Sequence, residues 1–429
     1  MVSSVAMTAT DVHRTIDAVW RIESARLIAG LARVVRDVGH AEELAQDALV
    51  IALEQWPRSG IPDNPGAWLM ATARNRAIDH LRHDRMRSRK HEALGHELEM
   101  EQQINGGTPE AGADDDIGDD LLRLMFTACH PLLSAEARTA LTLKLLAGLT
   151  TVEIARAFLV PEATIAQRIV RAKRTLAEAH VPFEIPRRDE LSERLSSVLG
   201  VIYLVFNEGY SATAGEDWMR PALCEEALRL GRILAELAPR EPEVHGLVAL
   251  MEIQASRMRA RTGPEGEPIL LMEQNRALWD RLLIHRGLLA LGRGEGLAES
   301  RGPYLLQASI AACHARAATA TDTDWVNITA LYDELARLTP SPVIELNRAV
   351  AVAMAYGPAA GLELADRLAA EGTLRSYHLL PSVRGDLLAR LGRYGEARGE
   401  FERAAGLTHN ARESRLLLAR AAACLRGEQ

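Results

Sequence analysis

The chain has 429 residues, of which 48% are hydrophobic, and its formal net charge is −8. These values exclude a globally disordered protein, and the longest apolar runs, such as GVIYLVF, fall far short of the roughly 20 residues of a membrane span. Cys129, Cys224, Cys313 and Cys424 form no CxxC pair. We therefore expect a cytoplasmic protein with buried thiols, without disulfides, metal or cofactor.

In the N-terminal segment, residues 11–90 are predicted to form helices only. Aromatic residues make up 4% of the chain and alternating β-branched runs are scarce, which favours an all-α fold. AEELAQDALVIALEQW (41–56) is strongly helical, and Pro57, Gly60 and Pro62 then break the pattern. A second helix is expected from about Gly66 into the basic stretch NRAIDHLRHDRMRSRK (75–90).

An acidic segment follows at residues 91–119, where we predict a flexible linker. Residues 91–120 contain ten Asp and Glu and neither Lys nor Arg, and no apolar stripe continues through them. The segment is either a solvated spacer or, on a sharper interpretation, a mimic of nucleic acid.

The clearest motif lies in residues 133–179, where TTVEIARAF, a turn at LVP and EATIAQRIVRAKRTLAEA predict a helix-turn-helix. On a helical wheel, four apolar residues of the second helix fall within about 60° of one another and form a buried stripe: Ile165, Ile169, Ala172 and Leu176. The opposite face and its flanks carry Thr164, Gln167, Arg168, Arg171 and Arg174. Such a face suits the major groove of DNA, because Arg pairs with guanine edges or phosphates and Gln with adenine. The alternative is a solvated basic face.

HVPFEIPRRDE (180–190) marks a boundary, and from residue 191 to 429 the chain is a succession of helix-length segments. LARLGRYGEARGEFERAAG has Gly392, Tyr394, Ala397, Phe401 and Ala404 at positions similar to those of tetratricopeptide repeats, and a weaker copy lies upstream. We therefore predict an α-helical, tetratricopeptide-like domain at 181–429.

Other chemistry-bearing residues give weak signals. Asn207, Glu208 and Tyr210 interrupt an apolar run, which predicts either a ligand site or an internal capping network. Two adjacent Cys-His pairs, at 129–130 and 313–314, lack the further ligands of a metal site. No catalytic motif is present in the sequence, so we expect a protein that is not an enzyme.

The helix-turn-helix resembles the C-terminal DNA-binding domain of bacterial sigma factors, in EIARAF and ATIAQRIVRAKRTL. One departure is Leu159, where the family usually has Gly at the turn. Upstream, GHAEELAQDALVIALEQW and PGAWLMATARNRAIDHLRHDRMR resemble the first conserved domain of the extracytoplasmic-function sigma factors. This resemblance covers about 170 residues, counted along the sequence.

The resemblance implies partners and roles for the N-terminal helices. Helix 41–56 is apolar on two faces, which fits full burial or a shared interface; the resemblance implies docking on the clamp of RNA polymerase core through Glu43, Leu44, Gln46, Asp47, Val50 and Leu53. It also implies that the basic stretch binds the −10 promoter element, through Asn75, Arg76, His80, Arg82, His83 and Arg85. The helix-turn-helix would then bind the −35 element, and the acidic linker would occupy the RNA channel of the polymerase.

The predicted fold class is all-α: two small helical sigma-factor domains, at 1–90 and 120–180, joined by the acidic linker and followed by the helical extension. The predicted function is promoter-specific transcription initiation with RNA polymerase core and promoter DNA as partners, regulated by the extension, which has an unknown protein or ligand partner of its own. The alternatives are a helix-turn-helix repressor or activator, and a tetratricopeptide-type signalling scaffold, each acting without polymerase.

Overall fold

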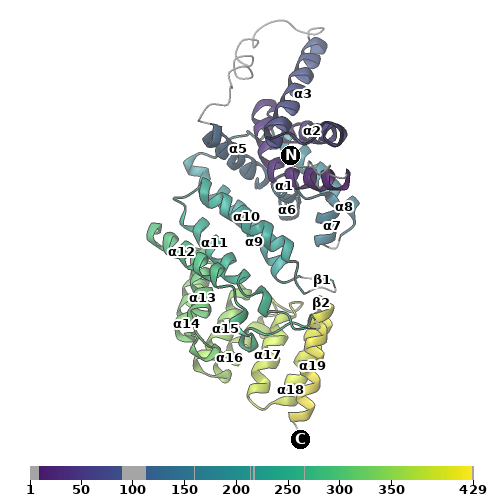
Figure 1. Cartoon of the computed structure of the whole chain (residues 1–429). Coiled ribbons are helices and arrows are strands. Elements are labelled where there is room, and N and C mark those ends of the chain that lie inside the picture. Colours follow the sequence, from purple (N-terminus) through teal and green to yellow (C-terminus); the bar gives the residue numbers. More distant parts are fainter. Residues whose placement is uncertain are drawn as a thin grey trace, which may run out of the picture. The chain divides into compact units, whose positions relative to one another are not determined.

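The structure is a computed structural model that describes residues 9–88, 113–158, 160–212, 214–215, 218–264 and 266–427. The chain forms two compact units, Met1–Val201 and Ile202–Gln429. Within the described ranges nearly all regular structure is helical, which confirms the all-α prediction (Figure 1). None of the described helices is long and apolar enough to cross a bilayer.

The first unit contains seven helices and the start of an eighth among its described residues. Six of the seven lie wholly within the two segments expected as sigma domains, whereas α5 begins in the expected linker, at residues 113–119, and continues into the second segment. The helices are α1 (Ala9–Val35), α2 (Val38–Ser59), α3 (Pro65–Ser88), α5 (Ala113–Ala128), α6 (Ala135–Leu145), α7 (Thr151–Phe158), α8 (Glu162–Glu178) and α9 (Arg188–Tyr210). The boundary between the units falls inside α9, later than the boundary expected at residue 180. The rest of the expected linker lies outside the described residues.

Helix α2 shows how the local sequence shapes this unit. Asp37 caps it, because its Oδ1 accepts a hydrogen bond of 2.8 Å from the His40 N–H. Its apolar residues pack against α1 and α3, and Trp56 is 1% exposed and meets Trp68 edge-on with ring centroids 5.3 Å apart. The helix is therefore anchored along one side, and its other side carries the polar residues.

The second unit is built from short helices joined by tight turns. They are α10 (Pro221–Leu237), α11 (Pro242–Ala255), α12 (Arg281–Leu297), α13 (Pro303–Arg316), α14 (Trp325–Leu338), α15 (Pro342–Tyr356), α16 (Pro358–Glu371), α17 (Leu379–Arg390), α18 (Tyr394–Leu407) and α19 (Ala411–Gly427). Short 3-10 turns lie at Met258–Ala260, Leu271–Glu273, Arg276–Leu278 and Ala320–Asp322. Five of these α-helices begin at a proline, a position where the missing N–H is not needed.

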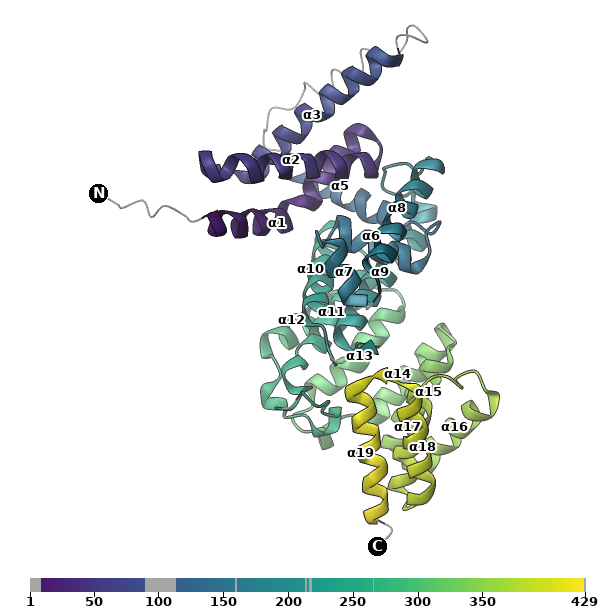
Figure 2. The same ribbon diagram turned by 90° about the vertical axis from the view of Figure 1, so that its right-hand side faces the viewer.

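The predicted repeat contacts are present in this unit. Ala397, Phe401 and Ala404 are buried, and a Cβ at Gly385 would lie 2.8 Å from the Phe401 ring, so glycine lets α17 approach α18 closely. Gly392 adopts a φ of 75° in the turn between them. Figure 2 shows α17, α18 and α19 packed side by side.

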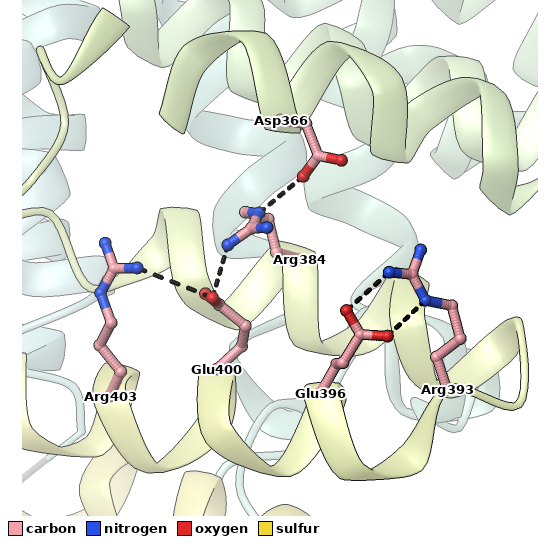
Figure 3. A network of polar contacts seen from close by, with 6 residues as sticks. All are labelled: Asp366, Arg384, Arg393, Glu396, Glu400 and Arg403. Carbon is pink, nitrogen blue, oxygen red and sulfur yellow. Dashed lines mark hydrogen bonds and ion pairs between the residues drawn. The ribbon is translucent and has the colours of Figure 1, made fainter. Parts of the chain in front are cut away.

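Ion pairs tie α16, α17 and α18 together on one side (Figure 3). The Arg384 side chain reaches from α17 to both neighbours, with Nε 2.9 Å from Asp366 Oδ1 and Nη1 2.5 Å from Glu400 Oε1. A second pair, Arg393 and Glu396, lies at the exposed start of α18.

Two strands of two residues each, β1 (Ala214–Gly215) and β2 (His409–Asn410), form a small parallel pair that the sequence did not predict. Asn410 is 1% exposed, and its Nδ2 donates to the Ala212 carbonyl at 3.2 Å. The C-terminal helix α19 is therefore attached to the first residues of this unit.

Candidate polymerase and promoter interfaces

The polar side of α2 holds most of the residues predicted to bind polymerase. Glu43 is exposed, Val50 is 52% exposed, and Gln46 and Leu53 are half-buried. Leu44 differs, because it is 2% exposed and belongs to the core of its own unit. In this conformation α2 thus exposes fewer residues to a partner than the six that were predicted to bind polymerase.

Helix α3 carries the residues predicted to bind the −10 element. Asn75 is exposed, and the Arg76 guanidinium forms an ion pair with Asp47 of α2. This pair joins one residue of each predicted site. The side chains of His80, Arg82, His83 and Arg85 lie outside the described residues.

The helix-turn-helix forms as α7 and α8. Thr150 and Glu153 form a reciprocal cap at the start of α7: the Thr150 N–H donates to Glu153 Oε2 at 2.8 Å and the Glu153 N–H donates to Thr150 Oγ1 at 3.2 Å. Ile154 and Ala155 are buried, and Phe158 is half-buried. Leu159, in the turn, lies outside the described residues.

The predicted two faces of α8 are confirmed. Ile165, Ile169, Ala172 and Leu176 are at most 5% exposed. The other side and its flanks hold the remaining residues: Gln167, Arg171 and Arg174 are exposed, and Thr164 and Arg168 are half-buried. Among these, the Arg174 Nε donates to Glu178 Oε1 at 2.7 Å.

Glu42 of α2 makes a contact that the sequence did not predict. Its side chain is 3% exposed and forms ion pairs with Lys173 of α8 and with Lys144 of α6, whose Nζ lies 3.7 Å from Glu42 Oε1. Gln46 donates to the same carboxylate at 2.7 Å. The N-terminal helices and the helix-turn-helix are therefore in direct contact within the first unit.

A second ion pair supports that contact. Asp120 of α5 is buried, lies 3.4 Å from the Arg33 Nε of α1 and accepts a hydrogen bond of 2.6 Å from Arg123. Asp120 is the last residue of the acidic run, and in this unit it is held by two arginines. A cavity of about 820 Å³ lies beside the contact, lined by residues of α1, α2 and α8, Lys173 among them, and by Arg36 in the turn between α1 and α2.

The ion pairs of Glu42 could not be predicted from the sequence. Glu42 is one of several polar residues on this helix, and Lys144 and Lys173 lie far along the chain. No local pattern distinguishes a lysine that turns inward from one that faces water.

The expectation of buried thiols is confirmed, because all four cysteines are buried. Burial raises the pKa of Cys129 to about 11 and that of Cys224 to about 12, so both stay protonated and unreactive near neutral pH. Within the described ranges no group of three or more His, Cys, Asp or Glu could hold a metal ion.

Comparison with known proteins agrees with this geometry. The family model for sigma-70 region 2 matches residues 22–87, and that for sigma-70 region 4 matches residues 123–176. The chain is thus a transcription factor of the sigma-70 class, with α1–α3 in region 2 and the helix-turn-helix in region 4. Residues 194–294 match a family of unknown function, DUF6596.

Three relatives refine the assignment. An uncharacterized protein of Rhizobium meliloti is 44% identical over 398 residues, 90% of each chain. The ECF RNA polymerase sigma factors SigC and SigK of Mycobacterium tuberculosis are 32% and 30% identical over 33% and 35% of this chain, and 70% and 78% of their own lengths. No solved structure matches the chain.

The chain belongs to the ECF RNA polymerase sigma factors and carries an additional helical C-terminal region. As a member of this non-enzymatic family, it directs transcription initiation by RNA polymerase, with core polymerase and promoter DNA as its partners.

Proposed function

We propose that three surfaces of the first unit divide the work of initiation. The exposed side of α2 binds the clamp of core polymerase, the basic end of α3 binds the −10 element, and the polar face of α8 binds the −35 element. The observation that carries this proposal is the two-sided α8, whose apolar stripe is buried while Gln167 and Arg171 are exposed.

Reconstitution tests the proposal directly. The purified chain is added to core polymerase and a set of promoter fragments, and the start sites of the transcripts are mapped. Promoter-specific transcripts support the proposal. Tight binding to duplex DNA without any core-dependent transcript would instead favour a repressor or activator that acts without polymerase.

We also propose that the Glu42 ion pairs hold regions 2 and 4 in a closed arrangement that initiation opens. By their names the −10 and −35 elements lie about 25 base pairs apart, roughly 80 Å at 3.4 Å per base pair of B-DNA. Two regions bound to such distant elements do not keep Glu42 at ion-pair distance from Lys173. Promoter binding therefore competes with this contact.

Core binding offers a test of the closed arrangement. Lys173→Met removes one ion pair from region 4, away from the proposed polymerase surface on α2. A coupling of about 1 kcal/mol between closure and core binding predicts roughly fivefold tighter binding of the variant, measured by fluorescence anisotropy of the labelled chain. Arg171→Gln, an exposed change on the same helix, serves as the control and should bind like the native chain.

The second unit has, in our proposal, a regulatory role, and the protein acts in the cytoplasm, where the polymerase is. A truncation that tests this regulatory role must keep the N-terminal part of α9. Arg194 Nη2 donates to the Phe126 carbonyl at 3.0 Å and Ser197 Oγ donates to the Cys129 carbonyl at 2.6 Å, so a cut after Ala179 would also damage region 4. A chain that ends at Val201 keeps both contacts. Unchanged strength and regulation of transcription by that chain would contradict a regulatory role.

A further inference from the structure

The second unit buries three arginines close to one another. Arg257, Arg261 and Arg276 are 8%, 7% and 9% exposed, and all three fall in the segment that matches the family of unknown function. They follow α11, in the turns that lead to α12. Arg257 is the central member, because its charge acts on both of the others.

The hydrogen bonds of these arginines go to neutral acceptors. Arg261 Nη1 donates to the Tyr210 carbonyl, and its guanidinium carbon lies 3.5 Å from the centroid of the Tyr210 ring. Arg276 Nη1 donates to the carbonyls of His314 and Ala317 at 2.6 and 2.7 Å. Arg257 Nη2 donates to the Gln254 side-chain oxygen. Carbonyl and amide oxygens satisfy donors but do not neutralise the charge.

No carboxylate forms an ion pair with these three guanidinium groups anywhere in the described chain. The negative charge of Asp322 attracts the Arg276 guanidinium, but the two side chains form no ion pair. The same unit neutralises other partly buried arginines in the ordinary way: Arg220 pairs with Glu208, and Arg384 with Glu400. The triplet is therefore an exception within its own unit.

Several buried donors of this cluster also lack a hydrogen-bond partner among the residues that the structure describes. They are the Nε of Arg257, the Nε of Arg276 and the indole Nε1 of Trp279. The Trp279 ring lies 5.8 Å from the guanidinium carbon of Arg257 and 4.8 Å from that of Arg276, so these donors belong to one neighbourhood. Unsatisfied buried donors next to uncompensated positive charge are costly unless a negative partner is supplied.

His314 completes the cluster without adding charge. Burial, followed by the charges of Arg257 and Arg276, lowers the pKa of His314 to about 4, so the imidazole is neutral at pH 7. Its Nδ1 is buried and has no hydrogen-bond partner within the described ranges. Among the described residues the cluster therefore holds three positive charges and no carboxylate paired with them.

We infer that this cluster is an anion-binding site and that its ligand is the phosphate group of a small molecule or phosphate itself. A guanidinium fork matches the geometry of phosphate and carboxylate oxygens, and three positive charges favour the more highly charged phosphate. The ring centroids of Tyr210 and Trp279 lie 5.9 and 5.8 Å from the guanidinium carbon of Arg257, within reach of a cation–π interaction. The signal-responsive part of this sigma factor is then the segment of unknown function.

Thermal unfolding of the full chain tests the site with inorganic phosphate as the probe. The native chain is compared in phosphate and in sodium chloride of equal ionic strength, and in parallel with acetate, which separates a phosphate site from a carboxylate site. We expect a saturable rise of the melting temperature in phosphate that exceeds the rise in chloride. Isothermal titration then gives the affinity.

Arg257→Gln is the decisive variant because the proposed site predicts opposite effects on the melting temperature, relative to the native chain, without and with phosphate. Without an oxyanion the variant should melt at or above the temperature of the native chain, since an uncompensated buried charge has been removed. In phosphate it should lose the stabilisation, and its affinity should fall at least tenfold. Arg293→Gln, an exposed residue of α12, removes the same charge and should behave like the native chain.

Three results would overturn the inference. One is the absence of any saturable response to phosphate or acetate in the native chain. Another is an unchanged response in Arg257→Gln. The third is an equal loss of stability by Arg257→Gln with and without oxyanion, which would make Arg257 a structural residue.

Discussion

The contact between regions 2 and 4 depends on one carboxylate, and a double-mutant cycle measures it. The cycle combines Glu42→Gln with Lys173→Met, one residue on α2 and the other on α8. Gln keeps the shape of Glu42 and can still hydrogen-bond, so the change removes charge with little change in packing. Met fills the space of the lysine stem.

The burial of each partner sets the magnitude. Glu42 is 3% exposed, whereas the side chains of Lys173 and Lys144 are 22% and 21% exposed and can reach water. Losing a charge-assisted hydrogen bond of this kind costs about 1.5–3 kcal/mol. The single Lys173→Met variant leaves Glu42 near Lys144, so we expect it to lose about 1–2 kcal/mol. The double variant Lys144→Met, Lys173→Met strands a buried carboxylate and should lose about 3–5 kcal/mol.

Hydrogen exchange read by mass spectrometry is the suitable assay, because peptides from α2 and α8 report this unit apart from the second one. We expect a coupling free energy of about 1–2 kcal/mol between Glu42 and Lys173. Arg171→Gln, exposed on the same helix, should leave the exchange unchanged. A coupling of zero, with both helices still protected, would refute the view that this ion pair joins the two regions.

Three further predictions concern other parts of the molecule. Arg171→Ala together with Arg174→Ala should weaken binding to the upstream promoter element and flatten its salt dependence by about one to two units of slope; an unchanged slope would remove that face from the DNA contact. In the folded chain the pKa of His314 is lowered to about 4. As the pH falls, the unfolded chain therefore protonates this imidazole before the folded chain does. The stability that the buried neutral imidazole contributes is thus present above pH 6.5 and is lost between about pH 6.5 and 4, by at most about 1.4 kcal/mol per pH unit. In urea unfolding, the free energy of unfolding of His314→Gln should depend less steeply on pH than that of the native chain. Parallel curves of unfolding free energy against pH would contradict this. Arg384→Gln should destabilise the second unit by about 1–3 kcal/mol because it links three helices, whereas Arg393→Gln, at an exposed pair, should leave the urea midpoint unchanged.

The features that the sequence predicted correctly are local ones. The buried stripe of α8 repeats at helical spacing, so a wheel finds it, and the small residues of α17 and α18 mark a close helix pair for the same reason. Proline and glycine marked where helices of the second unit begin and end, because φ is restricted at one and permissive at the other. A resemblance over about 170 residues supplied the family.

Only the tertiary structure decided which charged residues meet. Glu42 lies on the helix predicted to bind polymerase, yet its carboxylate is buried against lysines of region 4. No pattern in the sequence singles out Arg257 or Arg276, and folding places them in an interior where no carboxylate of the described chain forms an ion pair with them. The physical reason is the same in both cases. The energy of a charge depends on its distance from other charges and on its access to water, and neither quantity is written in the spacing of residues along the chain.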